Sequence, residues 1–378
     1  MRKVLLRIIF EDAWGWQSVG NELLVGYGWA ATIWVALAAI SISIMAAMAK
    51  DKSNALSSLV FWCAIPAVLC VVPFTSLPIA KTGIPLFGYG MMLFVGFSTA
   101  TWLAARRAAS VGIDPEVIWD MIMWLLIPGI VGARIIYLLQ YGDIVFAGKS
   151  GAELIMAAVA LWDGGIVFYG CVIGGSVGLF MYSRKRQIPL LELADVVAPS
   201  LFIGLGFGRI GCFLYGCCYG AACSLPWAVQ FPADSMTFGR FLDRSTKTGE
   251  KLFDANGVLI DVQQLASLPA EAVVSTLPLH PAQLYSSTLA FLLAGLLIWF
   301  FRRRPYSGSV IALACILYPV NRFILEIIRN DEPGRLGTGL TFSQWLSAGL
   351  CVCGCILMWW LHKNCSKKPG TKSAPAAS

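Results

Sequence analysis

The chain is short of charge. Only 13% of its 378 residues are Asp, Glu, Lys or Arg, whereas 58% are apolar. A soluble domain carries about 25% charged residues, so the usual water-exposed surface is excluded. Apolar runs of roughly 20 residues recur instead, each long enough to cross a bilayer core as a helix. Backbone groups in lipid must be satisfied within the segment, which favours helices. We therefore predict an all-α, polytopic helical membrane protein.

Other patterns are absent as well. The twelve cysteines contain no CxxC pair of the kind that binds zinc, so we expect no metal and no cofactor. Most of these cysteines lie in apolar runs, where cysteine behaves as a small buried hydrophobe. The net charge of +7 sits in short clusters between apolar runs, so we expect no nucleic-acid partner. No repeat with a fixed period is visible.

Hydropathy predicts membrane spans near 29–48, 57–76, 86–105, 118–140, 165–183, 195–216, 283–301, 308–328 and 343–361. The last seven form a core over residues 84–362, residues 1–80 are an N-terminal extension with about two extra spans, and residues 363–378 are a cytoplasmic tail. Basic clusters, such as Arg184-Lys185-Arg186, fall in every second gap, which places those gaps in the cytoplasm. The polar stretch 217–282 is then an external loop.

The N-terminus does not fit this alternation, because its basic residues would lie outside. We expect residues 1–16 to form an interfacial amphipathic helix, with Trp14 and Trp16 at the level of the lipid headgroups. The alternative is that residues 29–76 do not form two full spans. A cleaved signal peptide is not expected, because the apolar part is short and Glu11 and Asp12 follow it.

Arginines inside apolar spans are the strongest functional signal, since ionisable residues are expensive in lipid. Arg134 and Arg209 each lie in an apolar run. Arg322, Glu326 and Arg329 share one face of a helix that also carries Tyr318. Arg322 and Glu326 alone can be a structural ion pair, with Arg329 reaching the surface.

Glu326 is a single acidic neighbour and cannot neutralise the three cations Arg134, Arg209 and Arg322. The remaining positive charge therefore predicts a bound anion. At this depth the obvious anion is a lipid phosphate, which guanidinium binds through two parallel hydrogen bonds. Glycines surround these arginines, including Gly165, Gly170, Gly206 and Gly208. Small residues let helices approach closely, and they also leave room for a ligand against the backbone.

Several segments together resemble the prolipoprotein diacylglyceryl transferase family of bacteria. The most specific is the run from Gly208 to Gly220, which reads GRIGCFLYGCCYG. The other segments follow in the family's order over residues 84–362: Tyr89-Gly90-Met91, Arg134, Asp163–Gly170, Leu193–Pro199, His280–Tyr285, and Tyr318 through Arg329. The first two spans are an addition to the seven-span core that the resemblance implies.

The resemblance implies an enzyme that transfers the diacylglyceryl group of phosphatidylglycerol to the lipobox cysteine thiol of a preprolipoprotein and releases glycerol phosphate. Its partners would be phosphatidylglycerol, preprolipoprotein signal peptides and membrane lipids. It would lie in the bacterial inner membrane with its active site toward the outer face. Fixed positive charge in a dry site suits this reaction, because the leaving group is anionic.

The resemblance implies catalytic roles for Arg209 and Arg322, with Arg209 binding the lipid phosphate. Tyr169 stands where the family often has a histidine, and we expect it to donate a hydrogen bond instead. The chain's histidines, His280 and His362, lie elsewhere. The other residues expected to contact substrate are Tyr89, Arg134, Tyr318, Gly165, Gly170, Cys212, Cys217, Gly220, Glu326, Arg329 and His280.

Two further departures concern cysteine, since Cys212 replaces the family's signature asparagine and Cys217 its glutamate. In an oxidising compartment, Cys223 is expected to pair with Cys217 or Cys218. The alternatives to a transferase are an anion or lipid transporter, a membrane thiol oxidoreductase, and a catalytically inert lipid-binding homologue. Repeated broken helices would favour the transporter, and a CxxC pair with a quinone site would favour the oxidoreductase.

Overall fold

The computed structural model divides into two compact units, Met1–Phe94 with Ile210–Gln283 and Val95–Arg209 with Leu284–Ser378. The described residues are 4–9, 16–19, 22–26, 29, 32, 84–161, 164–165, 167–231, 235, 237–239, 252–254, 259–260, 273–329 and 340–365. Apart from Trp29 and Thr32, the predicted spans at 29–48 and 57–76 lie outside them, as does the tail beyond residue 365.

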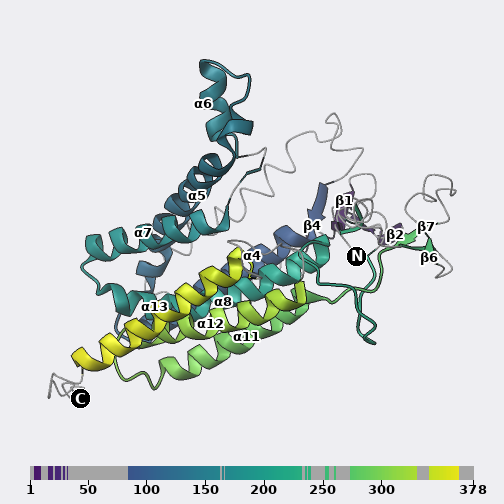
Figure 1. The fold of residues 1–378 in the computed structure, drawn as a ribbon. Coiled ribbons are helices and arrows are strands. Elements are labelled where there is room, and N and C mark those ends of the chain that lie inside the picture. Colours follow the sequence, from purple (N-terminus) through teal and green to yellow (C-terminus); the bar gives the residue numbers. More distant parts are fainter. Residues whose placement is uncertain are drawn as a thin grey trace. The chain divides into compact units, whose positions relative to one another are not determined.

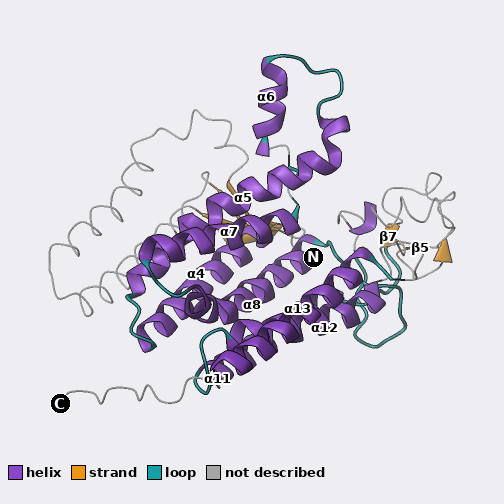
Figure 2. Ribbon diagram, turned by 60° about the vertical axis from the view of Figure 1, so that its left-hand side comes forward, coloured by secondary structure: helices purple, strands orange, loops and turns teal. Residues whose placement is uncertain are grey.

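Helices make up most of the described chain (Figure 2). Each predicted core span forms one: α4 (Gly88–Ser110), α5 (Pro115–Val145), α7 (Phe168–Arg186), α8 (Leu190–Tyr215), α11 (Ala282–Phe301), α12 (Ser309–Arg329) and α13 (Phe342–Cys365). Among the described helices, five are long and apolar enough to cross a membrane, namely α5, α8, α11, α12 and α13. The chain is therefore a polytopic helical membrane protein. Helix α6 (Ala152–Val159) is a single short addition after α5.

Short connections join the helices on the side of the basic clusters. Between α4 and α5, Gly112 adopts a positive φ of 78°, and the Asp114 carboxylate accepts a hydrogen bond from the Glu116 amide at 3.0 Å. Pro115 then occupies the first turn of α5, where its missing N–H costs nothing. Helix α7 ends at Gln187, which has a left-handed φ of 55°.

Glycines let α5 and α7 pack backbone against backbone (Figure 1). A Cβ atom at Gly132 would overlap the Gly170 carbonyl oxygen, and a Cβ atom at Gly170 would overlap that of Gly132. Gly174 lies in the same way against the Pro128 carbonyl. Close helix packing is thus what these glycines provide.

Buried charged side chains hold helices of the larger unit together near the basic clusters. Asp195 on α8 is fully buried and accepts hydrogen bonds from Arg304 at 2.9 Å and from the amides of Gly308 and Ile311 at 2.8 and 2.9 Å. It thereby caps the start of α12. Arg107 on α4 is also buried, and its Nε donates to the Val196 carbonyl of α8 at 3.0 Å. Both charges have partners, as burial requires.

The prediction of an all-α fold is wrong in part, because two small sheets are present. The first has the order β2-β3-β1-β4, from β1 (Val4–Ile9), β2 (Trp16–Val19), β3 (Glu22–Gly26) and β4 (Ile84–Phe87). The second, β6-β5-β7, comes from β5 (Leu252–Asp254), β6 (Leu259–Ile260) and β7 (Val273–Ser275), inside the predicted external loop.

Over Val4–Ile9, the described part of residues 1–15, the predicted helix is not formed. Residues Val4–Ile9 are rich in branched side chains that favour a strand. Strand β1 pairs in parallel with β3 and antiparallel with β4, where Ile8 lies opposite Ile84. A partner so far along the chain satisfies the backbone of residues 4–9, and a local reading of amphipathicity does not reveal it.

Candidate functional site

Arg322 and Glu326 form the predicted ion pair on α12. Arg322 Nη2 lies 2.7 Å from Glu326 Oε2, and the Glu326 side chain is only 1% exposed against 18% for Arg322. The Thr341 hydroxyl lies 3.4 Å from the other Glu326 oxygen. Such a buried carboxylate holds the guanidinium in one place. Arg329 is the last residue of α12, and its side chain lies outside the described residues.

Ser343 connects Arg322 with Tyr169. The Ser343 hydroxyl accepts from Arg322 Nη2 at 3.3 Å and lies 3.4 Å from the Tyr169 hydroxyl. The structure thus joins the two predicted catalytic residues of α12 and α7 through a buried serine on α13. Sequence reasoning did not identify Ser343.

A capping box at the start of α13 positions this serine. The Thr341 amide donates to Gln344 Oε1 at 2.9 Å, and the Gln344 amide donates to Thr341 Oγ1 at 3.3 Å. This reciprocal pair satisfies two amides that the first helical turn would otherwise leave unpaired. Ser343 follows two residues after the cap, within that rigid first turn. The sequence Thr-Phe-Ser-Gln before an apolar run is the signal that could have located it.

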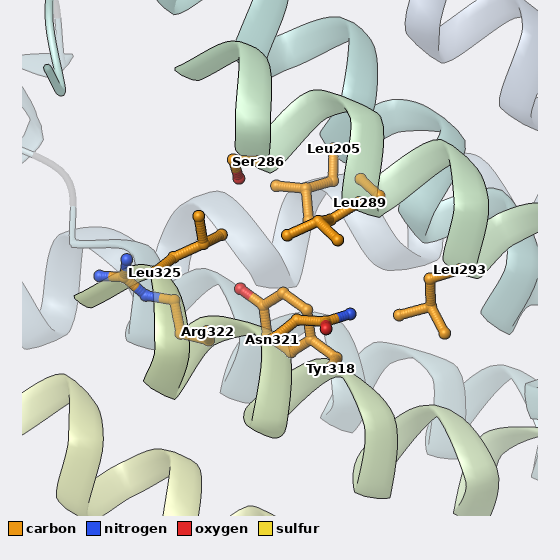
Figure 3. A pocket seen from close by; sticks show the side chains of 9 residues that line it. Leu205, Ser286, Leu289, Leu293, Tyr318, Asn321, Arg322 and Leu325 are labelled. Atoms are coloured by element: carbon orange, nitrogen blue, oxygen red, sulfur yellow. The ribbon is translucent and has the colours of Figure 1, made fainter. Parts of the chain in front are cut away.

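A small, mostly apolar pocket lies beside Arg322 (Figure 3). Its lining comes from α8, α11 and α12: Leu205, Ser286, Leu289, Ala290, Leu293, Tyr318, Asn321, Arg322 and Leu325. Figure 3 shows Arg322 toward one end and Leu293 toward the other, with leucine side chains and the Tyr318 ring between them. Charge at one end and hydrocarbon along the rest suit an amphipathic ligand.

Arg209 follows Leu205 by four residues on α8, so both lie on the same face of that helix. The Arg209 side chain is half-buried, and within the described part of the chain no hydrogen bond or ion pair to it is found. Helix α11 is held close by a hydrogen bond of 2.9 Å from Ser287 to the Gly206 carbonyl. In the described part of the chain, Arg209 therefore differs from Arg322, which is paired with Glu326.

Arg134 on α5 is surrounded by backbone carbonyls. Its guanidinium donates to the oxygens of Ala157, Ala158, Gly164 and Gly165 at 2.6–2.9 Å. Arginine has five N–H groups, so little remains for a phosphate. The carbonyls of Ala157 and Ala158 lie at the end of α6, and those of Gly164 and Gly165 precede α7. Arg134 therefore holds the connection between α6 and α7 in place.

Gly165 has a positive φ of 78° in the same connection. A Cβ atom there would overlap the Tyr137 ring and lie 2.8 Å from Arg134 Nη1, so only glycine fits. The predicted pair Gly165 and Arg134 is thus brought into contact. Gly170, also predicted to contact substrate, faces the α5 backbone.

The remaining predicted residues lie in the other unit. Gly211 lies against Tyr89, whose ring centroid is 6.2 Å from that of Tyr215. The Gly220 amide donates to the His280 carbonyl at 2.9 Å, and the His280 amide donates to Ala221 at 2.9 Å. The backbone of His280 therefore pairs with the end of the GRIGCFLYGCCYG segment.

Three cysteines gather where α8 ends. The sulfur atoms of Cys212, Cys217 and Cys218 all lie within 4.8 Å of one another. Hydrogen bonds with the Cys212 and Cys218 thiols, together with burial, raise the pKa of the Cys217 thiol far above its ordinary value. Cys217 and Cys223 have free thiols, so the predicted pairing of Cys223 with Cys217 or Cys218 is not formed. The turn after α8 brings Cys212 to Cys217 and Cys218 instead.

Comparison with known proteins finds a matching family model and similar enzymes. The family model described as Prolipoprotein diacylglyceryl transferase matches residues 78–360. The phosphatidylglycerol–prolipoprotein diacylglyceryl transferase 2 of Clostridium perfringens is 31% identical over 286 residues, covering 76% of this chain and 94% of the relative. The corresponding enzyme of Clostridium tetani is 32% identical over 72% of this chain and 92% of its own. That of Rhodopirellula baltica is 29% identical over 92% and 86%.

Proposed function

The chain belongs to the prolipoprotein diacylglyceryl transferase family, and we propose that Arg209 and Arg322 hold the phosphate of its lipid substrate. As a member of this family, the protein transfers the diacylglyceryl group of phosphatidylglycerol to the cysteine thiol of a prolipoprotein.

The half-buried Arg209, which has no acidic partner among the described residues, carries the proposal. Such a cation is unfavourable in lipid unless an anion joins it. Leu205, one turn earlier on α8, lines the apolar pocket that ends at Arg322. A phospholipid has the matching order of groups, with an anionic phosphate next to a glyceryl unit and hydrocarbon. Guanidinium matches the phosphate oxygens through paired hydrogen bonds.

The reaction breaks the bond between a glyceryl carbon and a phosphate oxygen. The substrate thiolate attacks that carbon, and the electron pair of the C–O bond leaves with the phosphate as glycerol phosphate. Negative charge therefore grows on the leaving oxygen, and a fixed Arg209 stabilises it more than water would. Glu326 and Ser343 orient Arg322 before substrate arrives, so no reorganisation is needed during the step.

Tyr169 acts through the Ser343 hydroxyl, which also accepts a hydrogen bond from Arg322. Its hydroxyl lies 3.4 Å from Ser343, in the place where the sequence pattern led us to expect a hydrogen-bond donor rather than a histidine base. In this proposal Tyr169 and Ser343 hold Arg322 against the headgroup. Arg134 supports them at a distance, because the connection it fastens leads directly into α7.

The proposal also includes the topology. Helices α4 and α7 would join α5, α8, α11, α12 and α13 in a seven-span core, with the basic ends in the cytoplasm. Arg209 and Tyr169 lie at the opposite ends of their helices, which would place the site toward the outer face of the inner membrane. There the preprolipoprotein signal peptide presents its lipobox cysteine.

The test is transfer from labelled phosphatidylglycerol in detergent micelles to a lipobox peptide. We expect Arg209→Ala to lower kcat about 100- to 1000-fold, the usual cost of removing one group that stabilises a transition-state anion. Arg322→Ala should be at least as impaired, because it also removes the buried ion pair with Glu326. Arg303→Ala is the matched control, since the side chain of this exposed arginine lies over the Trp299 ring at 4.7 Å. Full activity of Arg209→Ala would refute the assignment.

A further inference from the structure

The pocket beside Arg322 contains a polar side chain that the transferase mechanism above does not use. Asn321 lines this pocket together with the apolar side chains of Leu289, Ala290 and Leu293. It is half-buried, and within the described part of the chain no hydrogen bond to its side-chain amide is found. An amide in apolar surroundings is unfavourable without a hydrogen-bonding partner. Asn321 therefore indicates that a ligand in this pocket carries a polar group.

Asn321 and Arg322 face different parts of the pocket. A helix turns by about 100° per residue, so the side chains of consecutive residues diverge. Figure 3 shows the Arg322 guanidinium on one side of the Tyr318 ring and the Asn321 amide on the other, toward Leu293. From one end to the other, the pocket thus offers a cation, then a neutral amide, and then hydrocarbon.

Contacts between the three helices hold the walls of this pocket in place. The Gly206 carbonyl of α8 accepts a hydrogen bond from the Ser287 hydroxyl of α11 at 2.9 Å, and a Cβ atom at Gly206 would overlap the Phe291 ring of α11. The centroid of the Phe202 ring of α8 lies 5.5 Å from that of the Tyr318 ring of α12. The backbone that carries the pocket amide is therefore positioned before a ligand binds, as a specific contact requires.

We propose that Asn321 Nδ2 donates a hydrogen bond to an ester carbonyl oxygen of phosphatidylglycerol, and that this contact makes the enzyme select ester-linked over ether-linked lipid. The inference rests on the proposed function, because that function places the lipid phosphate at Arg322. The ester nearest to the phosphate is the one on the middle carbon of the glyceryl unit, which is bonded to the carbon that reacts. We assign the hydrogen bond to this ester, because Asn321 is the residue next to Arg322.

The chemistry of the two lipid classes explains the selection. The asparagine amide has two N–H donors, and an ester carbonyl is an acceptor that fits one of them. An ether lipid has a methylene group where the ester has its carbonyl, so the Asn321 amide would stay without that partner. A site that is built to hydrogen-bond its substrate discriminates against an analogue that lacks the bonding group. The pocket is small, so it takes the glyceryl unit, and the hydrocarbon chains continue into the bilayer.

The test compares transfer to a lipobox peptide from phosphatidylglycerol with two ester-linked chains and from its analogue with two ether-linked chains, using the full-length protein in detergent. The wild type should prefer the ester lipid by about 2- to 12-fold in kcat/KM, the contribution of one hydrogen bond. Asn321→Leu, which is similar in size but has no donor, should bring this ratio close to one. Val320→Leu is the matched control and should keep the wild-type ratio, because Val320 is exposed and does not line the pocket. Equal kcat/KM for the two lipids in the wild type, or an unchanged ratio in Asn321→Leu, overturns the proposal.

The ratio of the two kcat/KM values isolates the contact of Asn321 with the lipid. Both lipids are assayed on one preparation, so an unfolded fraction of a variant cancels from the ratio. A lipid with an ether only at the middle carbon should behave like the lipid with two ethers, and the opposite result overturns the assignment to this ester. Arg209→Ala separates the two proposals, because it should slow transfer from both lipids and keep their ratio. Full activity of Arg209→Ala, with a ratio that still depends on Asn321, would refute the phosphate assignment and support the ester contact.

Discussion

Arg134→Lys distinguishes two roles for this buried arginine. From the sequence alone it was expected to contact the lipid phosphate, whereas in the structure its guanidinium donates to four backbone carbonyls between Ala157 and Gly165. Lysine keeps the charge but has only three donors on one nitrogen. At least one of the four carbonyls therefore loses its partner.

The expected size of the effect follows from that count. A hydrogen bond to a charged group contributes about 1.5–3 kcal/mol, so the open state of the connection should become about 10- to 150-fold more populated. Transfer should lose kcat because Tyr169 begins α7 next to this connection. KM for phosphatidylglycerol should change little, since Arg134 has few donors left for phosphate.

Hydrogen–deuterium exchange of the amides at residues 157–165 measures the open state directly. Arg106→Lys is the matched control, because this exposed α4 arginine lies over the Trp102 ring at 4.2 Å and does not contact the connection. An unchanged exchange rate of these amides, together with a raised KM for phosphatidylglycerol, would refute the role of Arg134 in holding the connection between α6 and α7 in place. Arg134 would then be a phosphate ligand, as the sequence first indicated.

Three further substitutions test the packing and the network. Ser343→Ala removes the hydroxyl between Arg322 and Tyr169 and should lower the transfer rate about fivefold, for about 1 kcal/mol of lost orientation; in a double-mutant cycle its effect should not add to that of Tyr169→Phe. Gly174→Ala places a methyl group against the Pro128 carbonyl and should lower stability by about 1–3 kcal/mol, seen as a lower Tm in detergent. Asp195→Ala removes one of the two carboxylates that pair with Arg304 and the acceptor of two amides, and should lower stability by about 3–5 kcal/mol in the same measurement.

Each of these has its own contrary outcome. Additive effects of Ser343→Ala and Tyr169→Phe would show that the two hydroxyls act separately. Gly204→Ala is the control for the glycine substitution, because nothing lies within 4 Å of the added Cβ; equal Tm values for the two variants would contradict the close packing of α5 and α7. An unchanged Tm for Asp195→Ala would mean that water reaches its partners.

Local pattern and chemistry in the sequence were enough to predict the helices and part of the site. Long apolar runs have to become helices in lipid, so all seven core helices were predicted within a few residues of their ends. The ion pair of Arg322 and Glu326 followed from their spacing of four on one helix, a property that needs no other element. The capping box of Thr341 and Gln344 is equally local, and the sequence Thr-Phe-Ser-Gln is sufficient to predict it.

Contacts between distant residues decided the rest. Strand β1 forms because β4 supplies a partner from beyond residue 80, and Ser343 matters because α7 and α13 bring Tyr169 to it. Arg134 and Arg209 look alike in the sequence, as single arginines in apolar runs. Only the tertiary structure separates them, since it surrounds one with carbonyls and leaves the other without an acidic partner among the described residues. The free-energy cost of burying a charge depends on the groups near it in space, and these are not determined by its neighbours in the chain.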